Sequence, residues 1–223
     1  MAADDPSVIS ALTVRPARAE DAAQMARVNV QCWQETYRGL MSDAVLDDPG
    51  LLAMRGQFWT AALTDQRYRQ NRAAVAERDG QLVGIAMSGP PLDAGAWTRH
   101  LYVLYVRAAE HGMGAGPTLL EAVIDPDESA MLWVADPNPR AQAFYRKHGF
   151  VADGAAQVEG GVREIRMVRG ARHVIDSPRV AVEVNASRPG RDHTSQRHQR
   201  RSPRRAPPEA PTPSAATTAT TPW

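Results

Sequence analysis

The chain has 223 residues, of which 43% are hydrophobic and 23% charged, and its formal net charge is +1. This length suits one well-buried core. No apolar run approaches the roughly 20 residues that span a bilayer. The first residues are acidic and lack the basic start of a signal peptide. The single cysteine, Cys32, excludes an intrachain disulfide and a multi-cysteine metal site. We therefore expect a globular, cytoplasmic protein.

Charge is unevenly distributed along the chain. Residues 171–223 hold nine arginines and four acidic residues, whereas residues 1–170 carry an excess of acidic residues. Beyond residue 176 the composition is dominated by Ser, Arg, Pro, Ala and Thr, which cannot bury enough apolar surface to offset the entropy of ordering. We expect a disordered basic tail at 176–223 that contacts polyanions weakly at most, without specific nucleic-acid binding.

The first half of the chain predicts a strand, two helices and a hairpin. Periodicity and turn residues place them at 12–15 (strand), about 20–37 (helix), 51–63 (helix), and 73–77 and 82–87 (strands). Asp79-Gly80 stands between the last two segments, and this dipeptide is a strong indicator of a tight hairpin turn.

The middle of the chain carries a glycine-rich turn between a strand and a helix. After a loop at 88–97 come a predicted strand at 98–106, the segment His111-Gly112-Met113-Gly114-Ala115-Gly116, and a predicted helix at 118–124. Glycines at every second position let the backbone turn sharply and aim free N–H groups outward. The positive end of the helix dipole favours an anion at the same place. A phosphate-bearing cofactor is the natural ligand of such a turn.

The second half predicts alternating short elements that close the domain. They are a strand at 131–135, a helix at 140–148, and a hairpin of strands at 150–157 and 162–168 around Gly160-Gly161. Asn138 is a good N-cap and Pro139 a good first helical residue, while Gly149 suits the helix end. The order β-α-α-β-β-β-α-β-α-β-β predicts an α/β domain over residues 12–169.

Asn138 and Tyr145 are seven residues apart, or about two helical turns, so both face the same side of the predicted helix. Ala141 lies between them and permits close approach, while Phe144 faces the core. If this helix packs beside the glycine-rich turn, Asn138 and Tyr145 flank whatever the turn binds.

These motifs together resemble the GNAT superfamily of acetyl-coenzyme A-dependent N-acetyltransferases. The family has a strand ending in valine, here Val106, followed in register by the segment at 111–116. Its second half is matched by Leu132, Val134, Asn138, Ala141, Phe144-Tyr145 and Gly149-Phe150, and bacterial members share the pattern of Trp33 and Tyr37-Arg38-Gly39-Leu40. The resemblance covers residues 12–169 and implies the GNAT fold, a central mixed sheet flanked by helices.

The resemblance also implies roles for individual residues. Backbone groups of Leu104, Tyr105 and Val106 would hold the pantetheine arm of the coenzyme, and the Asn138 side chain would bond to the pantetheine as well. The pyrophosphate would be held by the glycine-rich turn, formed by His111, Gly112, Met113, Gly114, Ala115 and Gly116. Tyr145 would give a proton to the departing thiolate. No metal is implied.

Two positions depart from the family pattern. His111 stands where Gln or Arg is usual, so its charge depends on pH. Pro117 stands where many members have Arg or Lys, which removes a basic group and one N–H donor from the helix start. Both changes could weaken coenzyme binding, but neither abolishes the backbone cradle.

The base that deprotonates the amine is less clear from the sequence. Trp133 occupies a position where some relatives have Glu, and His100 occupies another. With a period of two, His100, Tyr102, Leu104 and Val106 share one face of the strand, so His100 or a bound water is the predicted base. Glu35 and Asp136 are weaker candidates, and a purely structural His100 is the alternative.

The acceptor side is expected to include Tyr37 and Trp97, both assigned to substrate binding. Cys32 is expected to be a small core residue. The predicted reaction is direct attack by a primary amine in a ternary complex, with a polyamine or aminoglycoside-like antibiotic as acceptor. The alternatives are acetylation of a protein N-terminus or lysine, or a coenzyme A-binding module without catalysis; a homodimer is also open.

Overall fold

The structure, a computed structural model, describes residues 11–92 and 95–171. These residues belong to one compact unit, Met1–Val174. The predicted tail at 176–223 lies outside the described residues.

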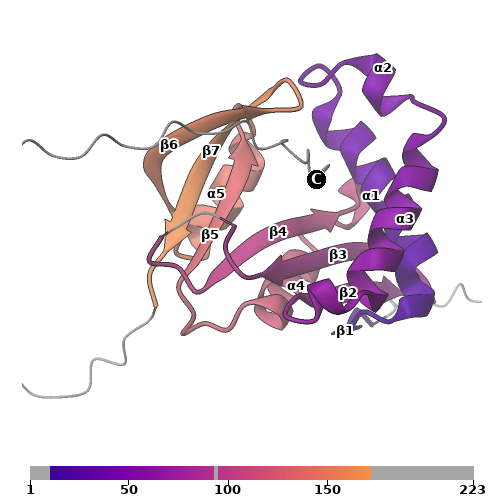
Figure 1. Ribbon diagram of the computed structural model, residues 1–223, viewed down its shortest axis with the longest axis horizontal. Helices are drawn as coiled ribbons and strands as arrows, with labels where there is room; N and C mark the ends of the chain where they lie inside the picture. Colours follow the sequence, from indigo (N-terminus) through magenta and orange to yellow (C-terminus); the bar gives the residue numbers. More distant parts are fainter. Residues whose placement is uncertain (1–10, 93–94, 172–223) are drawn as a thin grey trace, which may run out of the picture. The chain divides into compact units, whose positions relative to one another are not determined.

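The described chain forms a seven-stranded sheet with helices on both faces (Figure 1). The strands are β1 (Thr13–Pro16), β2 (Arg72–Arg78), β3 (Gln81–Gly89), β4 (Arg99–Val106), β5 (Ala130–Ala135), β6 (Val151–Glu159) and β7 (Val162–Arg169). The α-helices are α1 (Ala22–Tyr37), α2 (Asp43–Leu46), α3 (Leu51–Thr64), α4 (Ala115–Val123) and α5 (Pro139–Lys147). Three short 3₁₀ turns are η1 (Ala19–Asp21), η2 (Gln66–Tyr68) and η3 (Ala108–Glu110).

The predicted helices and strands are confirmed in order and type, but α4 begins at Ala115, inside the segment predicted as a turn. Strand β3 continues through Ser88 and Gly89, which the sequence analysis assigned to a loop. The one-turn helix α2 was not predicted, because four residues are too short to show a helical period. Its Leu46 is nevertheless fully buried, against Trp33 and Leu51.

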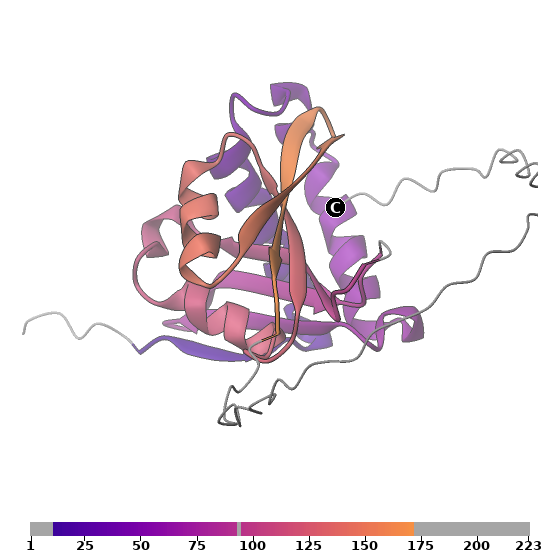
Figure 2. The same ribbon diagram turned by 90° about the vertical axis from the view of Figure 1, so that its left-hand side faces the viewer.

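Strand order in the sheet is β1-β2-β3-β4-β5-β7-β6. Neighbours pair antiparallel except β4 and β5, which are parallel and connected through α4. The predicted mixed α/β sheet is therefore confirmed. Turned by 90°, the molecule shows α4 and α5 on one side of the sheet and α1 and α3 on the other (Figure 2).

Each face of the sheet has its own core. On one face, the apolar side of α4 and the ring of Phe150 pack against residues of β2 to β5 and β7. On the other, α1 and α3 pack against β2, β3 and β4 around Met25 and Trp59. Cys32 belongs to this second core, where burial raises the pKa of its thiol to about 12, in agreement with a packing role.

Local chemistry explains the positions of the turns. Asp79 and Gly80 both have positive φ values, 53° and 71°, as the predicted tight hairpin between β2 and β3 requires. The Asn138 side-chain oxygen accepts the Ala141 N–H at 3.1 Å, which confirms the N-cap of α5, and Pro139 begins the helix.

The beginning of the domain is fixed by an ion pair between Arg15 of β1 and Asp21 of η1. Arg15 donates two hydrogen bonds to the carboxylate, at 2.7 and 2.9 Å, and the Arg18 N–H donates a third at 2.8 Å. Asp21 is 7% exposed. The bond from Arg15 holds the pKa of Asp21 below its usual range.

We predict that Asp21→Asn lowers the free energy of unfolding by about 2 kcal/mol at neutral pH, because the buried carboxylate loses charge-assisted hydrogen bonds. Since the folded pKa is lowered, this stabilisation is present above the ordinary value of about 3.9 and is lost as the pH falls through the folded value. Urea denaturation of both proteins at pH 7 and at about pH 2 measures it. The matched control is Asp43→Asn, whose exposed pair with Arg38 contributes little. Equal losses in the two variants at pH 7 would contradict the prediction.

Candidate active site

The two parallel strands in the middle of the sheet separate after three residue pairs. Pairing of β4 with β5 runs from Arg99↔Ala130 to Leu101↔Leu132. Beyond this point β4 continues to Val106 and stays paired with β3, and β5 continues to Ala135 and stays paired with β7. In the described part of the chain, the register therefore gives residues 102–106 no partner on the edge that faces β5. An unpaired edge of this kind can accept an extended ligand as an added strand.

A β-bulge accompanies the separation. Met87 pairs with Val103, but Ser88 pairs with Leu101, so Tyr102 is an extra residue in β4. The prediction that His100, Tyr102, Leu104 and Val106 share one face is therefore wrong. Leu104 and Val106 pack on the α4 side, whereas Tyr102 packs on the α1 side. Simple alternation fails here because the bulge shifts it by one residue.

His100 lies in the paired part of β4, opposite Met131. It is 6% exposed, and its ring lies 4.6 Å from the ring of Tyr102. The predicted base thus lies where β4 and β5 are still paired, next to the ring of Tyr102.

The glycine-rich turn connects the free end of β4 to α4. Gly112 and Gly114 have φ values of 81° and 93°, and a Cβ at either position would meet nothing within 4 Å. The first bond within the helix runs from the Thr118 N–H to the Gly114 carbonyl. The amides of Gly114, Ala115 and Gly116 precede that bond and have no partner within the helix. The turn therefore presents the open, donor-rich backbone that the sequence predicted for an anion.

Neighbouring side chains hold this turn in place. The His111 Nε2 atom donates to the Val106 carbonyl at 2.8 Å, so the side chain ties the turn back to the end of β4. Glu35 of α1 accepts the Ala108 N–H at 2.9 Å. Both side chains thus fix the backbone, a role that the sequence analysis did not assign to either.

Helix α5 packs beside the turn, as the motif analysis required. Phe144 is the contact residue, because a Cβ on Gly116 would lie 3.2 Å from its ring. Tyr145 is 8% exposed and packs against Phe144 and Phe150, with ring centroids 5.3 and 5.8 Å apart. Burial raises the pKa of Tyr145, and the nearby Tyr105 raises it further. The phenol is therefore kept protonated at neutral pH.

Three tyrosines from three elements gather around the separated strands. The Tyr105 hydroxyl accepts a hydrogen bond from Trp33 Nε1 at 2.9 Å and is hydrogen-bonded to Tyr37. Tyr145 interacts electrostatically with both other phenols. Beneath this group Arg55 is 3% exposed, and its guanidinium lies 4.1 Å from the Trp33 ring. The sequence analysis named Tyr37 and Tyr145 but gave Tyr105 a backbone role only.

Trp97, the other predicted substrate residue, lies in a separate stack. The Arg166 guanidinium lies 4.7 Å from the Trp97 ring and 5.6 Å from the Trp133 ring, and its Nε donates to Asp153 at 2.8 Å. Asp136, a weaker base candidate, forms an ion pair with Arg163. Trp97 and Asp136 are therefore held by arginines of β7.

The sequence analysis missed Glu164 of β7, which is half-buried and pairs in register with Ala135 at the end of β5. The predicted hairpin at 162–168 contained the information to find it, because Ile165 and Met167 occupy the core side. Strict alternation then directs Glu164 to the opposite face, beside α1.

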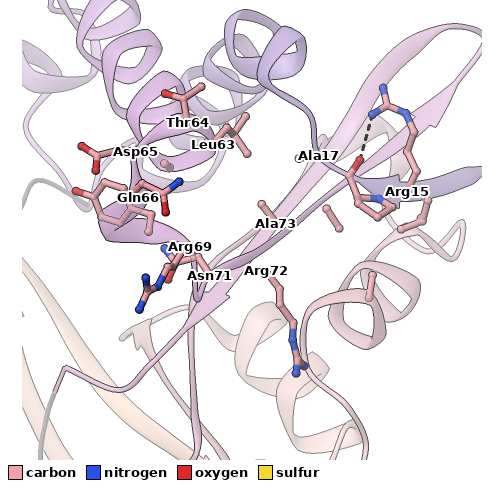
Figure 3. A pocket seen from close by; sticks show the side chains of 16 residues that line it. Arg15, Ala17, Leu63, Thr64, Asp65, Gln66, Arg69, Asn71, Arg72 and Ala73 are labelled. Atoms are coloured by element: carbon pink, nitrogen blue, oxygen red, sulfur yellow. Dashed lines mark hydrogen bonds between the residues drawn. The ribbon is translucent and has the colours of Figure 1, made fainter.

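A hollow of about 540 Å³ lies elsewhere, between the end of α3, η2 and the first two strands (Figure 3). Arg15, Asp65 and Arg72 are among its lining residues, and none of the lining residues comes from β4, the glycine-rich turn or α5. Among residues 11–92 and 95–171, no three His, Cys, Asp or Glu side chains gather as metal ligands. Nor does any helix in those ranges have the length and apolar character to cross a membrane.

Comparisons with known proteins agree with this architecture. The model of the acetyltransferase (GNAT) family matches residues 29–150. The Mycobacterium tuberculosis protein named probable N-acetyltransferase Rv2775 is 29% identical over 151 residues, which cover 65% of this chain and 83% of the relative. The Bacillus subtilis protein named uncharacterized N-acetyltransferase YuaI is 26% identical over 143 residues, covering 61% of this chain and 79% of the relative.

Among solved structures, the PaiA N-acetyltransferase of Thermoplasma acidophilum, determined in complex with coenzyme A, has the same fold. The TM-score is 0.55 and the identity 18%, over 70% of this chain and 98% of that one. The fold and the family match define an acyltransferase of the N-acetyltransferase class. The chain belongs to the GNAT family of acetyl-coenzyme A-dependent N-acetyltransferases.

We predict that Tyr105→Phe destabilises the fold by about 1–2 kcal/mol, because the Trp33 and Tyr37 donors lose their buried acceptor. Thermal and urea denaturation measure the loss. Tyr68→Phe, on the surface turn η2, is the control and should change stability by less than about 0.5 kcal/mol. Equal effects in both variants would show that the buried hydrogen bonds contribute nothing measurable.

Proposed function

We propose that this protein transfers an acetyl group from acetyl-coenzyme A to the primary amine of a small molecule, a polyamine or an aminoglycoside-like compound. The observation that carries the proposal is the convergence of three features: the unpaired edge of β4, the glycine-rich turn and the buried phenol of Tyr145. The single buried thiol of Cys32 fits the reducing cytoplasm, where we place the protein.

The residues present fit the coenzyme. In this proposal the backbone of Leu104, Tyr105 and Val106 pairs with the pantetheine arm, and the amides of Gly112, Gly114, Ala115 and Gly116 hold the pyrophosphate. The Met113 N–H, expected to join them, is instead bonded to the Glu110 carbonyl at 3.3 Å, and His111 fixes the turn. The Asn138 Oδ1 atom is occupied by the helix cap, which leaves its Nδ2 hydrogens to donate to the pantetheine.

Tyr145 serves as the general acid in this proposal. The bound coenzyme supplies the acetyl thioester, and the amine nitrogen forms a bond to its carbonyl carbon as the carbon–sulfur bond breaks. The Tyr145 Oη atom, which burial keeps protonated, hydrogen-bonds to the departing sulfur and gives it a proton in this proposal. His100 is the base that the sequence suggests, although it lies in the paired part of β4.

Closure of the acceptor side supports a small-molecule acceptor over a protein lysine or N-terminus. The tip of the β6–β7 hairpin approaches the segment after α1, where a Cβ on Gly160 would lie 3.9 Å from the Met41 Cε atom. In this proposal the approach of the two segments limits access for a bulky acceptor. The rival, a coenzyme A-binding module without catalysis, does not require the buried phenol of Tyr145.

We predict that Tyr145→Phe lowers kcat/KM about 10²–10³-fold and leaves coenzyme A affinity unchanged, because the acid acts only during bond breaking. Free-thiol release measures turnover with a panel of spermidine, kanamycin and a lysine-containing peptide. Tyr68→Phe is the matched control. Full activity of Tyr145→Phe would exclude this acid, and coenzyme A binding without turnover on any amine would favour the non-catalytic module.

We predict that Gly114→Ala weakens coenzyme A binding about tenfold, because its φ of 93° costs an L-residue about 1–2 kcal/mol and shifts the amides of the turn. Isothermal titration with coenzyme A measures the affinity. Gly56→Ala, in the interior of α3, is the control: its added Cβ meets nothing within 4 Å and should leave affinity unchanged. Unchanged affinity in Gly114→Ala would contradict the assigned cradle.

A further inference from the structure

Glu164 lies beside the part of β5 that is no longer paired with β4. It pairs with Ala135, the last residue of β5 and three residues beyond Leu132, where pairing with β4 ends. Because Ile165 and Met167 occupy the core on the α4 and α5 side, the Glu164 side chain extends from the opposite face. That is the face on which α1 packs, and the hairpin bearing Glu164 reaches toward Met41 beyond the end of α1.

The carboxylate is close to the group of tyrosines. It interacts electrostatically with Tyr37, which is hydrogen-bonded to Tyr105 and interacts with Tyr145. The acid assigned above and Glu164 therefore both interact with the phenol of Tyr37. An acceptor nitrogen bound beside this phenol would be near a proton acceptor and the protonated Tyr145.

Glu164 differs from Glu110 and Glu128, two other half-buried carboxylates, in the group that donates a hydrogen bond to it. Glu110 and Glu128 are bonded to arginines, at 3.0 and 2.7 Å respectively, whereas the bond to Glu164 comes from the neutral amide of Gln157, at 2.9 Å. Burial raises the pKa of Glu164, and the charge of Glu159 raises it further. A carboxylate without a cationic neighbour is stabilised by any cation that binds beside it.

The two arginines that flank Glu164 in β7 interact with other residues. Arg166, next on the same face of β7, is bonded to Asp153 and stacked on Trp97. Arg163, which alternation directs to the other face, pairs with Asp136. Among residues 11–92 and 95–171, the titratable groups that interact with Glu164 include the phenol of Tyr37 and the carboxylate of Glu159.

We propose that Glu164 binds the ammonium group of the acceptor and takes from it the proton that must leave before the nitrogen attacks. The inference rests on the proposed function and specifies the acceptor as an unhindered primary alkylammonium, held between a carboxylate and the rings of Tyr37 and Tyr105. Glu164 then takes the place that the sequence analysis gave to His100.

The proton balance closes with these groups. Glu164 takes one proton from the ammonium, which frees the nitrogen lone pair to form the bond to the acetyl carbon. The carbon–sulfur bond breaks, and Tyr145 gives its proton to the sulfur. The nitrogen then loses its second proton, which returns to Tyr145, and Glu164 releases the first proton to solvent. The net products are the amide, the thiol and one proton.

The test compares Glu164→Gln with the wild-type chain in free-thiol assays from pH 5 to 9, using spermidine, kanamycin and the lysine-containing peptide. We expect kcat/KM of the variant to fall about 10²–10³-fold, with coenzyme A affinity and melting temperature unchanged. The residual rate should rise steadily with pH, because only the uncharged fraction of the amine then reacts. The wild type should instead lose activity below the raised pKa of Glu164.

A neighbouring variant provides a second, independent readout. Glu159→Gln removes a charge that raises the pKa of Glu164, so the acidic limb of the wild-type profile should move to lower pH while the maximal rate is kept. Glu20→Gln, an exposed residue of η1, is the matched control and should move nothing.

The outcomes separate failure of this inference from failure of the proposed function. Turnover by the wild type with an unchanged profile in Glu164→Gln overturns the inference alone. Loss of the acidic limb in His100→Gln, with the limb retained in Glu164→Gln, overturns it in favour of His100. Absence of wild-type turnover with every amine of the panel overturns the proposed function and the inference together.

Discussion

The separation of β4 from β5 is the constraint on which the rest of the site depends. Two parallel strands normally pair along their length, and an unpaired edge within a sheet leaves backbone groups without partners. Here the pairing stops at Leu101, next to the extra residue Tyr102 in β4. In the proposed function, an extended ligand that pairs with this backbone offsets the cost of leaving it unpaired. The glycine-rich turn, α5 and the β6–β7 hairpin are all placed relative to this opening.

The groups around the opening between β4 and β5 are buried phenols and a half-buried carboxylate, and their burial determines how readily they gain or lose protons. Tyr145, Tyr105 and Tyr37 all have pKa values above their ordinary value, and burial contributes to each. Such phenols stay protonated at neutral pH, so each keeps an O–H group that can donate a hydrogen bond. The side chain of Glu164 has the opposite property, because it is a potential anion bonded to a neutral amide. A site built in this way favours a cation that loses a proton during the reaction.

Much of the fold could be predicted because its turns carry specific chemistry. Asp79-Gly80 marked the first hairpin, Asn138 and Pro139 marked the start of α5, and the glycines at 112 and 114 adopt the positive φ values that only such a turn requires. The bulge at Tyr102 could not be predicted, because its residues have no distinctive turn chemistry and the misalignment is set by pairing with β3. That one residue reversed the faces assigned along β4. The side-chain contacts of Tyr105 and the position of Glu164 were missed for a related reason, since both depend on contacts between elements far apart in the chain.

The proposed site has a coenzyme half formed by backbone groups and an acceptor half formed by side chains. The turn at 111–116 presents backbone amides, and the side chain of His111 faces the Val106 carbonyl behind them. Substitutions such as His111 and Pro117 can therefore accumulate in this half while the ligand-facing atoms stay the same. In the proposed site, the acceptor half is made of side chains on α1 and β7, beside the approach of Gly160 to Met41. A change in the length of the β6–β7 hairpin would resize that half without altering the backbone cradle, so acceptor choice can diverge among proteins that keep one way of holding the donor.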